Sequence, residues 1–367
     1  MENLFGKSLA DLQALCESEK LPKYNARQIC DWLYSKRVNT IDAMTNLSLK
    51  TRSQLKVKYM IKRSMPDDCQ VSCDGTKKYL FRVGAHPTPV GCGKNGSECF
   101  QTDASKTVQL FVETVYIPDG DRATLCVSSQ AGCRMGCRFC VTGANGFHGN
   151  LDASEILNQI FSIPEFSKLS NIVYMGMGEP FDNYDAVMQS INVLTSEWGL
   201  AWSPHRITVS TVGLLPGIKR FLCESECHLA ISLHNPVAEE RLAIIPMQKT
   251  YPIADTLRLL EAHDWSGQRR LSFEYTVFGG LNDDKKHAEA LVNLIAGMRC
   301  RVNLIRFHAS SSAPFRVPTR ETLQNFMTIL SAHGIRCTIR ASRGEDIMAA
   351  CGLLAGKNSD AGGCRHD

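Results

Sequence analysis

The spacing of apolar residues divides this chain into three parts. In the first part, Leu9, Leu12 and Leu15 recur at helical spacing, and residues 26–34 repeat the pattern with Ile29, Trp32 and Leu33. Both stretches predict short amphipathic helices. We therefore expect residues 1–65 to form a small helical accessory domain.

The second part, residues 66–122, has the pattern of extended chain. The segments "KKYLFRV" and "VQLFVETVYIP" are rich in β-branched and aromatic residues and predict strands. Between them, residues 84–107 are rich in Gly, Pro, Ser and Asn, which predicts a loop or disordered insertion. Its Cys92 and Cys99 could bind a metal, but unpaired loop thiols are the more common arrangement.

From residue 123 onward, short apolar runs alternate with helical periods. The runs predict strands at 124–128, 172–175, 207–210, 229–233, 271–277 and 302–307. The periods between them predict helices at 153–161, 184–195, 254–263, 285–298 and 320–333. This alternation predicts an α/β fold of six βα units around a parallel sheet, either open or closed into a barrel. Reacting groups then collect at the carboxyl ends of the strands, where Ser210, Ser232, His234 and His308 occur.

The amino-acid composition indicates the cellular compartment of the protein. With 44% hydrophobic and 21% charged residues, the 367-residue chain is typical of globular proteins in aqueous solution. No apolar run approaches the roughly 18 residues of a membrane span, and the first ten residues lack the apolar core of a secretory signal. Sixteen cysteines without an export signal indicate a reducing compartment. We expect a cytoplasmic protein.

The net charge of +4 permits nucleic-acid binding without requiring it. Basic residues cluster near the N-terminus at Arg52, Lys56, Lys58, Lys62 and Arg63. A solvated helix face and a surface that contacts phosphates explain this cluster equally well.

Cys133, Cys137 and Cys140 carry the strongest chemical signal, a C-x3-C-x2-C spacing in a Gly-containing loop after a predicted strand. Four thiolates saturate a [4Fe–4S] cluster, so three would leave one iron open to a substrate. Phe139 could shield such a cluster from water. Zinc remains an alternative, although His148 is the only nearby fourth ligand and zinc usually takes paired C-x2-C units.

The triad resembles the hallmark of the radical SAM superfamily, whose cluster cleaves S-adenosylmethionine (SAM) inside a partial (βα)6 barrel. "YMGMGEP" then follows the next strand, so that Gly178 and Glu179 match the segment that binds the SAM amino group. Ser210, Ser232, Leu233 and His234 lie where the superfamily contacts the SAM carboxylate and ribose. The resemblance implies one [4Fe–4S] cluster and SAM as cofactors.

A closer resemblance rests on "RATLCVSSQAGC", "ITVSTVGLLPGI", "AISLHNP", "RLAIIPM", "RGEDIMAACG" and the N-terminal "NARQICDWLY". Together these segments are similar to the RlmN/Cfr family of rRNA adenine methyltransferases. The similarity covers nearly the whole chain except residues 84–107 and the tail. It implies a helical RNA-binding domain over 1–65, a β-rich connection over 66–122, a radical SAM core over 123–357 and a disordered tail over 358–367.

The family's mechanism assigns the remaining roles. A first SAM methylates Cys351, and the radical made from a second SAM removes hydrogen from that S-methyl group. The carbon radical adds to adenine, Glu113 takes the ring proton, and Cys126 attacks the carrier sulfur, so that the product leaves and a disulfide remains. C2 methylation of a 23S rRNA adenosine is favoured over C8 methylation, with tRNA as a second substrate.

The resemblance also implies partners: RNA, an electron donor such as flavodoxin or ferredoxin, no membrane, and a monomeric enzyme. One departure concerns His308 in "VNLIRFHASSSAPF", which replaces a family asparagine that contacts SAM, while Arg306 stands where the family has proline. Histidine can still donate a hydrogen bond. Two rivals stay open: a radical SAM enzyme of another class, such as a methylthiotransferase or maturase, and a non-catalytic zinc-bearing RNA-binding protein.

Overall fold

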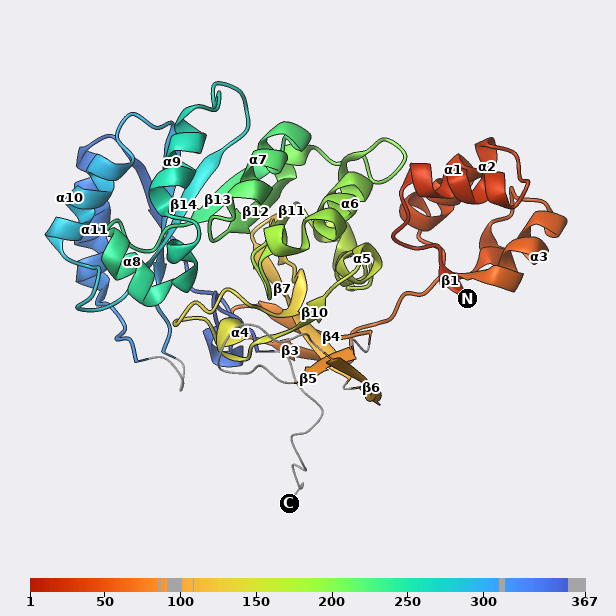
Figure 1. Cartoon of the computed structure of the whole chain (residues 1–367), viewed down its shortest axis with the longest axis horizontal. Helices are drawn as coiled ribbons and strands as arrows, with labels where there is room; N and C mark the ends of the chain where they lie inside the picture. Colours follow the sequence, from red (N-terminus) through yellow and green to blue (C-terminus); the bar gives the residue numbers. More distant parts are fainter. Residues whose placement is uncertain (85–86, 91–100, 108, 310–313, 356–367) are drawn as a thin grey trace, which may run out of the picture.

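The computed structural model describes residues 1–84, 87–90, 101–107, 109–309 and 314–355, and of 87–90 and 101–107 only the backbone. A helical N-terminal unit lies at one end of the molecule, beside a large sheet whose parallel strands are covered by helices (Figure 1). Within the described residues, no helix combines the length and the apolar character that crossing a bilayer demands. The expected tail over 358–367 lies outside these residues, as do Cys92 and Cys99.

The N-terminal unit is built from three α-helices, a π-helix (Asp31–Ser35) that continues the second of them, a short 3-10 helix (Ile41–Ala43) and one pair of very short strands. Its elements are α1 (Leu9–Ser18), α2 (Tyr24–Cys30), α3 (Leu49–Lys58), β1 (Glu2–Asn3) and β2 (Tyr59–Met60). Ser8 and Asp11 form a reciprocal capping box that starts α1. The rings of Phe5 and Tyr34 pack on Phe161, at centroid distances of 5.4 and 6.1 Å. These contacts dock the unit against the helical layer of the sheet.

The main sheet has ten strands in the order β16-β15-β14-β13-β12-β11-β8-β7-β4-β3. Its parallel part comprises β8 (Arg122–Cys126), β11 (Asn171–Tyr174), β12 (Ile207–Thr211), β13 (His228–Ser232), β14 (Leu271–Val277), β15 (Cys300–Arg306) and β16 (Arg336–Ile339). Its antiparallel part comprises β3 (Asp68–Val71), β4 (Lys77–Val83) and β7 (Leu110–Asp119). The parallel part has one strand more than the expected six, because β16 is a four-residue edge strand without an apolar run.

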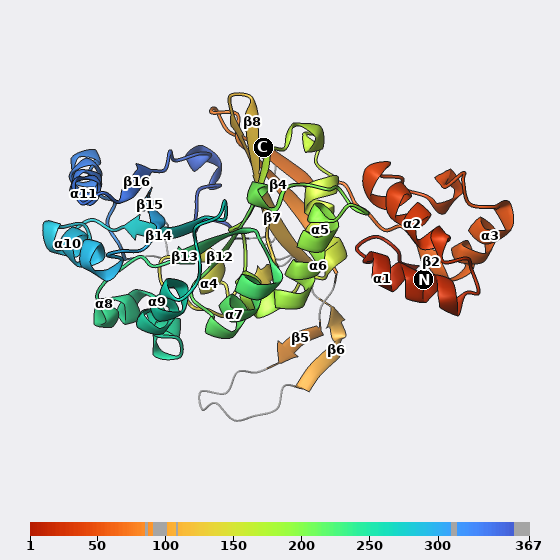
Figure 2. The same ribbon diagram turned by 90° about the horizontal axis from the view of Figure 1, so that it is seen from above.

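Helices cover the outer face of the parallel strands (Figures 1 and 2). They are α5 (Ala153–Phe161), α6 (Tyr184–Thr195), α7 (Leu215–Glu224), α8 (Ala238–Ile244), α9 (Ile253–Glu261), α10 (Lys285–Leu294) and α11 (Arg320–Ala332). Strand β14 shows how the sheet is oriented. Leu271, Phe273 and Tyr275 are buried, and the Tyr275 ring packs on Phe326 of α11 at 5.0 Å. The alternate residues of β14 face the interior of the partial barrel.

One predicted helix boundary was wrong, and helices α7 and α8 were not among the predicted elements. Helix α10 ends at Leu294 instead of reaching residue 298, because Gly297 takes a φ of +78° that a helix does not allow. The hydrophobic pattern missed α7, since Pro216 and Gly217 read as helix breakers. Both lie in its first turn, where proline is tolerated.

The insertion at 84–107 is not simply a loop. Its described part contains β5 (Pro87–Val90) and β6 (Gln101–Thr107), which pair antiparallel and project from the main body (Figure 2). The Gly/Pro composition argued against strands, but proline is tolerated at the edge of a sheet, and both strands of an isolated pair are edges.

Candidate active site

The three cysteines of the C-x3-C-x2-C motif lie between β9 (Gln130–Gly132) and α4 (Val141–Ala144). Strand β9 pairs antiparallel with β10 (Phe147–Asn150), and the Cys133 N–H donates to the Gly146 carbonyl at 2.8 Å. The loop therefore folds back on itself. Cys133, Cys137 and Cys140 all line one cavity of ≈ 190 Å³ at the carboxyl ends of the parallel strands.

Burial governs the acidity of these thiols. It raises the pKa of Cys133 to about 12 and that of Cys137 well above its usual value. The charge of Arg241 opposes the shift at Cys137. This fully buried guanidinium is held by the carbonyls of Val212, Ser232 and Leu233, at 2.8 to 3.0 Å. Thiolates in such a place need a positive charge bound to them, which iron supplies.

No three His, Cys, Asp or Glu side chains in the described ranges are close enough to hold a metal ion. The fit to an iron–sulfur cluster therefore rests on the donor set: three thiols facing one cavity, with a buried cation behind Cys137. Thiolates are the usual ligands of such clusters.

Glu179 lies in the same cavity, at the end of the turn that follows β11 (Asn171–Tyr174). Its carboxylate accepts from the N–H groups of Phe181 and Val212 at 3.1 and 2.9 Å. Burial nevertheless raises the pKa of Glu179 to about 7. Gly178 has a φ of +97°, and a Cβ there would lie 2.5 Å from the Gln130 Cβ. Only glycine lets this turn press against β9 and present Glu179 to the cavity.

Ser210, Ser232 and His234 reach the cavity from the ends of β12 and β13. His234 has a φ of +56°, a rare conformation for a residue with a side chain. Its Nδ1 accepts from the Thr276 N–H at 2.9 Å, so the ring proton must be on Nε2. Burial lowers the pKa of His234 to about 3, and the neutral ring stacks edge-on against Phe139 at 4.9 Å.

Two further thiols, which lie more than 200 residues apart in the sequence, face the same cavity. Cys126 is the last residue of β8 and is buried, which raises its pKa to about 12. Cys351 is exposed and lies in the C-terminal segment 349–355. The Val141 N–H and the Thr142 hydroxyl hold this segment through the carbonyls of Gly352 and Leu354 at 2.8 and 2.6 Å. Five cysteines thus border one hollow, and every cysteine in the described residues is a free thiol.

Similarity to known proteins identifies the family of this chain. A family model described as the ribosomal RNA large subunit methyltransferase N-terminal domain matches residues 2–61, and the radical SAM superfamily model matches 127–292. A probable dual-specificity RNA methyltransferase RlmN from Phocaeicola vulgatus is 51% identical over 352 residues, which is 96% of this chain and 94% of the relative. This chain belongs to the RlmN family of radical SAM RNA methyltransferases.

Two further matches agree with this membership. The dual-specificity RNA methyltransferase RlmN of Syntrophus aciditrophicus is 40% identical, covering 97% of both chains. The crystal structure of a radical SAM methyltransferase from Sphaerobacter thermophilus is 37% identical, covers 96% of this chain and 99% of its own, and superposes with a TM-score of 0.83. The family and the α/β radical SAM fold expected from the sequence motifs are confirmed.

Three expected site residues of the RlmN pattern lie outside the cavity lining: Glu113, Leu233 and His308. Leu233 is fully buried in the core. His308 contacts Ser342 through Nε2 at 3.1 Å and lies 3.6 Å from Glu345 through Nδ1. A histidine side chain is longer than that of asparagine, and here it is directed to the segment before Cys351.

Glu113 is buried on β7, next to the cavity. Its carboxylate pairs with Lys78 of β4 at 3.1 Å and accepts from the Ala355 N–H at 2.7 Å. In this conformation Glu113 anchors the segment that carries Cys351.

Sequence reasoning missed two polar residues that line the cavity, Glu274 and Thr276 of β14. Glu274 is buried, accepts from Asn303 at 2.7 Å, and its Oε2 has no hydrogen-bond partner among the described residues. The signal was present in "LSFEYTV", where polar residues alternate with large apolar ones. A strand buried on its outer face shows its inward positions by this alternation.

Proposed function

We propose that this RlmN-family methyltransferase methylates C2 of adenosine in 23S rRNA and in tRNA, through an S-methyl group carried on Cys351. One observation carries the proposal: Cys351, Cys126 and the cysteine triad border a single cavity. A thiol that carries a methyl group must lie close both to the site of SAM cleavage and to the thiol that releases the product. C2 of adenine is an electron-poor carbon, so a radical route suits it where transfer of a methyl cation does not.

Cys133, Cys137 and Cys140 would hold one [4Fe–4S] cluster, which supplies the electron that cleaves SAM into a radical. Phe139, packed between His234 and Phe278 at 4.9 and 5.4 Å, closes the cavity against water beside Cys140. Such shielding protects a radical from side reactions.

Glu179 would accept hydrogen bonds from the SAM ammonium, because its carboxylate is the acidic side chain presented by the glycine turn. Ser210 and Ser232 offer hydroxyls, and His234 offers an Nε2–H donor in a fixed orientation. These groups match the carboxylate and ribose oxygens of SAM in chemistry. The side chains of Leu233 and His308 are not part of this proposed set.

In the later steps, Glu113 would take the proton from the adenine ring. Its position beside Ala355 implies that the C-terminal segment shifts when RNA enters, since that segment now covers the carboxylate. Cys126 would then attack the sulfur of Cys351, so that an S–S bond forms as the bond from this sulfur to the transferred carbon breaks. The released carbon takes up a proton and becomes the methyl group, and the Cys126–Cys351 disulfide is left for reduction.

The proposed setting is the cytoplasm, where a monomeric enzyme would meet RNA and an electron donor such as flavodoxin or ferredoxin. The sixteen cysteines are consistent with a reducing compartment. The basic helix α3 would contact RNA phosphates, since Lys50, Lys56 and Lys58 are exposed along it.

Mass spectrometry of adenosines from rRNA and tRNA of a deletion strain tests the assignment. We expect 2-methyladenosine to disappear and to return with the restored gene. Unchanged 2-methyladenosine would defeat the C2 assignment, and a change in 8-methyladenosine instead would assign C8.

Cys351→Ala tests the carrier role. The variant should keep its iron and sulfide content but form no methylated RNA, because the methyl group has no carrier. Cys223→Ala is the matched control, since Cys223 is exposed on α7 and lies outside the cavity lining. Zinc without iron or sulfide in anaerobically purified protein would favour the non-catalytic rival.

A further inference from the structure

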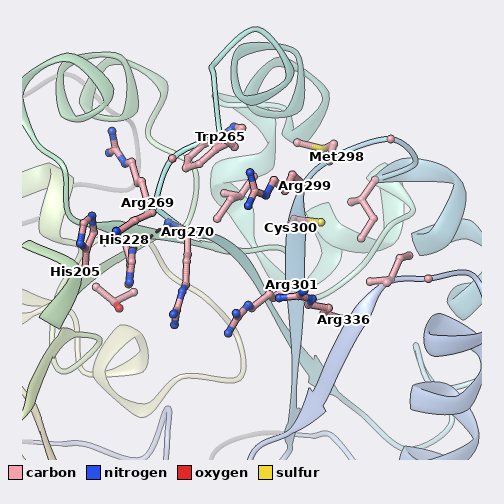
Figure 3. Close-up of a pocket in the computed structure, with 18 of the residues that line it drawn as sticks. His205, His228, Trp265, Arg269, Arg270, Met298, Arg299, Cys300, Arg301 and Arg336 are labelled. Carbon is pink, nitrogen blue, oxygen red and sulfur yellow. Dashed lines mark hydrogen bonds between the residues drawn. The ribbon is translucent and has the colours of Figure 1, made fainter.

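A second hollow, of ≈ 1280 Å³, opens at the amino ends of the same parallel strands (Figure 3). We name it the arginine cavity after the seven arginines in its lining: Arg122, Arg206, Arg269, Arg270, Arg299, Arg301 and Arg336. His205, His228 and His333 also line it. Among the described lining residues there is no Asp or Glu.

The strand register explains how these charges come together. Arg301 of β15 lies opposite Arg336 of β16, and Arg270 directly precedes β14. Side chains two residues further along each strand point to the same face. That face carries Ser272, Glu274 and Thr276 on β14, and it leads at the carboxyl ends to the cavity with the cysteines. The arginine cavity and the cysteine cavity are therefore the two ends of one barrel interior.

Some of the arginines are already engaged by the fold. Arg206 donates to the carbonyls of Leu169 and Ser170, both at 2.6 Å. Arg269 donates to those of Phe221 and Leu222 at 3.3 and 3.2 Å. These hydrogen bonds tie both guanidiniums to neighbouring backbone carbonyls.

Arg270, Arg301 and Arg336 differ, because their guanidiniums have no hydrogen bond or ion pair within the described parts of the chain. They lie near one another in Figure 3. Burial and then repulsion from Arg270 and Arg336 lower the pKa of Arg301. Arg301 is half-buried, whereas Arg270 and Arg336 are exposed. Water screens part of the repulsion between the three charges, and a bound anion would offset the remainder.

We propose that the arginine cavity binds phosphate groups of the RNA backbone, away from the adenosine that reacts. Arginine forks match phosphate oxygens in pairs, and a hollow admits a phosphodiester chain more readily than the convex surface of an acidic protein. β14 spans about 20 Å between the two ends, a length that a few nucleotides cover. The inference rests on the proposed function for its choice of RNA, while a free polyphosphate would offer the same chemistry.

The test uses full-length protein and an oligouridylate, which contains no adenosine and so does not need the methylation site. Arg270→Gln/Arg301→Gln/Arg336→Gln should weaken binding at least about tenfold and lower the slope of log affinity against log salt by about 2. The matched control is Lys219→Gln/Lys286→Gln/Arg320→Gln, which removes three exposed charges outside the cavity and should change neither quantity.

Additional variants and ligands distinguish the possible results of this experiment. The corresponding triple Arg→Lys variant should retain most of the affinity for oligouridylate. The triple Gln variant should unfold at the same temperature as wild type, which shows that its weaker binding does not come from a damaged fold. Equal binding by the Gln variant and wild type would overturn the proposal. If the triple Gln variant loses tripolyphosphate binding but still binds oligouridylate, the ligand of the cavity is a free phosphate compound, and the assignment to RNA is overturned.

Loss of flavodoxin binding alone would also overturn the proposal, because the cavity would then serve an acidic protein. Oligouridylate binding does not depend on methylation. A wild type that binds it through the arginines but makes no methyladenosine would keep this inference and defeat the proposed function.

Discussion

The two ends of the barrel interior have the same strands but opposite chemistry. At the carboxyl ends, five thiols, two serines and a neutral histidine border a hollow of ≈ 190 Å³. At the amino ends, seven arginines border one of ≈ 1280 Å³. Between them, Asn303 joins Glu274 at 2.7 Å and Thr338 at 2.9 Å. This polar layer separates the end that carries the thiols from the end that carries the arginines.

The size of a hollow therefore does not identify the end of the barrel at which the reaction takes place. Among the described residues that line the larger hollow, Cys300 is the only cysteine, whereas five cysteines between residues 126 and 351 line the smaller one. In a parallel sheet, loops at the carboxyl ends bring distant residues together, and these loops vary without disturbing the strands. At the amino ends, the residues that border the hollow include the first residues of the strands themselves.

The largest effect is expected at the carboxyl end. Cys137→Ala should abolish iron binding and methylation together, because two thiolates cannot retain a cluster designed for three. Iron and sulfide analysis beside RNA methylation would measure this. Cys300→Ala at the opposite end is the control and should leave both intact. Retained iron in the Cys137 variant would break the assignment of chemistry to the carboxyl end.

Gly178→Ala should lower the free energy of unfolding by about 3 kcal/mol, through a clash with Gln130 and an unfavourable φ. Gly120→Ala is the control: its φ is +56°, but nothing lies within 4 Å of the added Cβ. That variant should lose only about 1 kcal/mol. Urea unfolding compares the two. Equal losses would mean that the close approach of the turn to β9 is not a constraint.

SAM affinity should fall as the pH drops below 7. Burial places the pKa of Glu179 at about 7, so protonation removes the charge that attracts the SAM ammonium. The loss approaches about tenfold per pH unit, and Glu179→Gln should bind weakly at every pH. Calorimetric titration with SAM between pH 5 and 8, within about the range of protein stability, would measure both. A pH-independent wild type would contradict the assignment.

The ligand-free protein should respond to pH with the opposite sign. Because the pKa of Glu179 is raised from 4.5 to about 7, the folded state binds this proton more tightly than the unfolded state. Its contribution to stability is therefore present below 4.5 and is lost as the pH rises through about 7. Glu179→Gln should remove this slope in urea unfolding.

The smallest effect is expected at the amino end. Arg301→Gln should change the free energy of unfolding by less than about 0.5 kcal/mol, in the stabilising direction, since it relieves repulsion from Arg270 and Arg336. Added salt should reduce the gain by screening. Urea unfolding beside Lys286→Gln measures it. A clear loss of stability in the Arg301 variant would show that this end is structural.

Much of the fold was predictable from local pattern. The ranges 77–83, 153–161, 184–195 and 271–277 coincide with β4, α5, α6 and β14, because each has a clear period and usable end signals such as Asp152 with Glu155. Helix α7 was missed because Pro216 and Gly217 lie in its first turn, whereas the missed strands β5, β6 and β16 have no such pattern. Strand β16 alternates exposed and half-buried residues, and β5 with β6 pair only with each other.

Motif spacing along the chain was enough to establish the family and to locate the cysteine triad, because such spacing is local information. Only the tertiary structure decided that Glu113 anchors residue 355 and that His308 turns toward Ser342. It also decided that Arg270, Arg301 and Arg336 share one cavity. These contacts join residues far apart in the chain. They depend on strand order and register, which local apolar spacing does not encode.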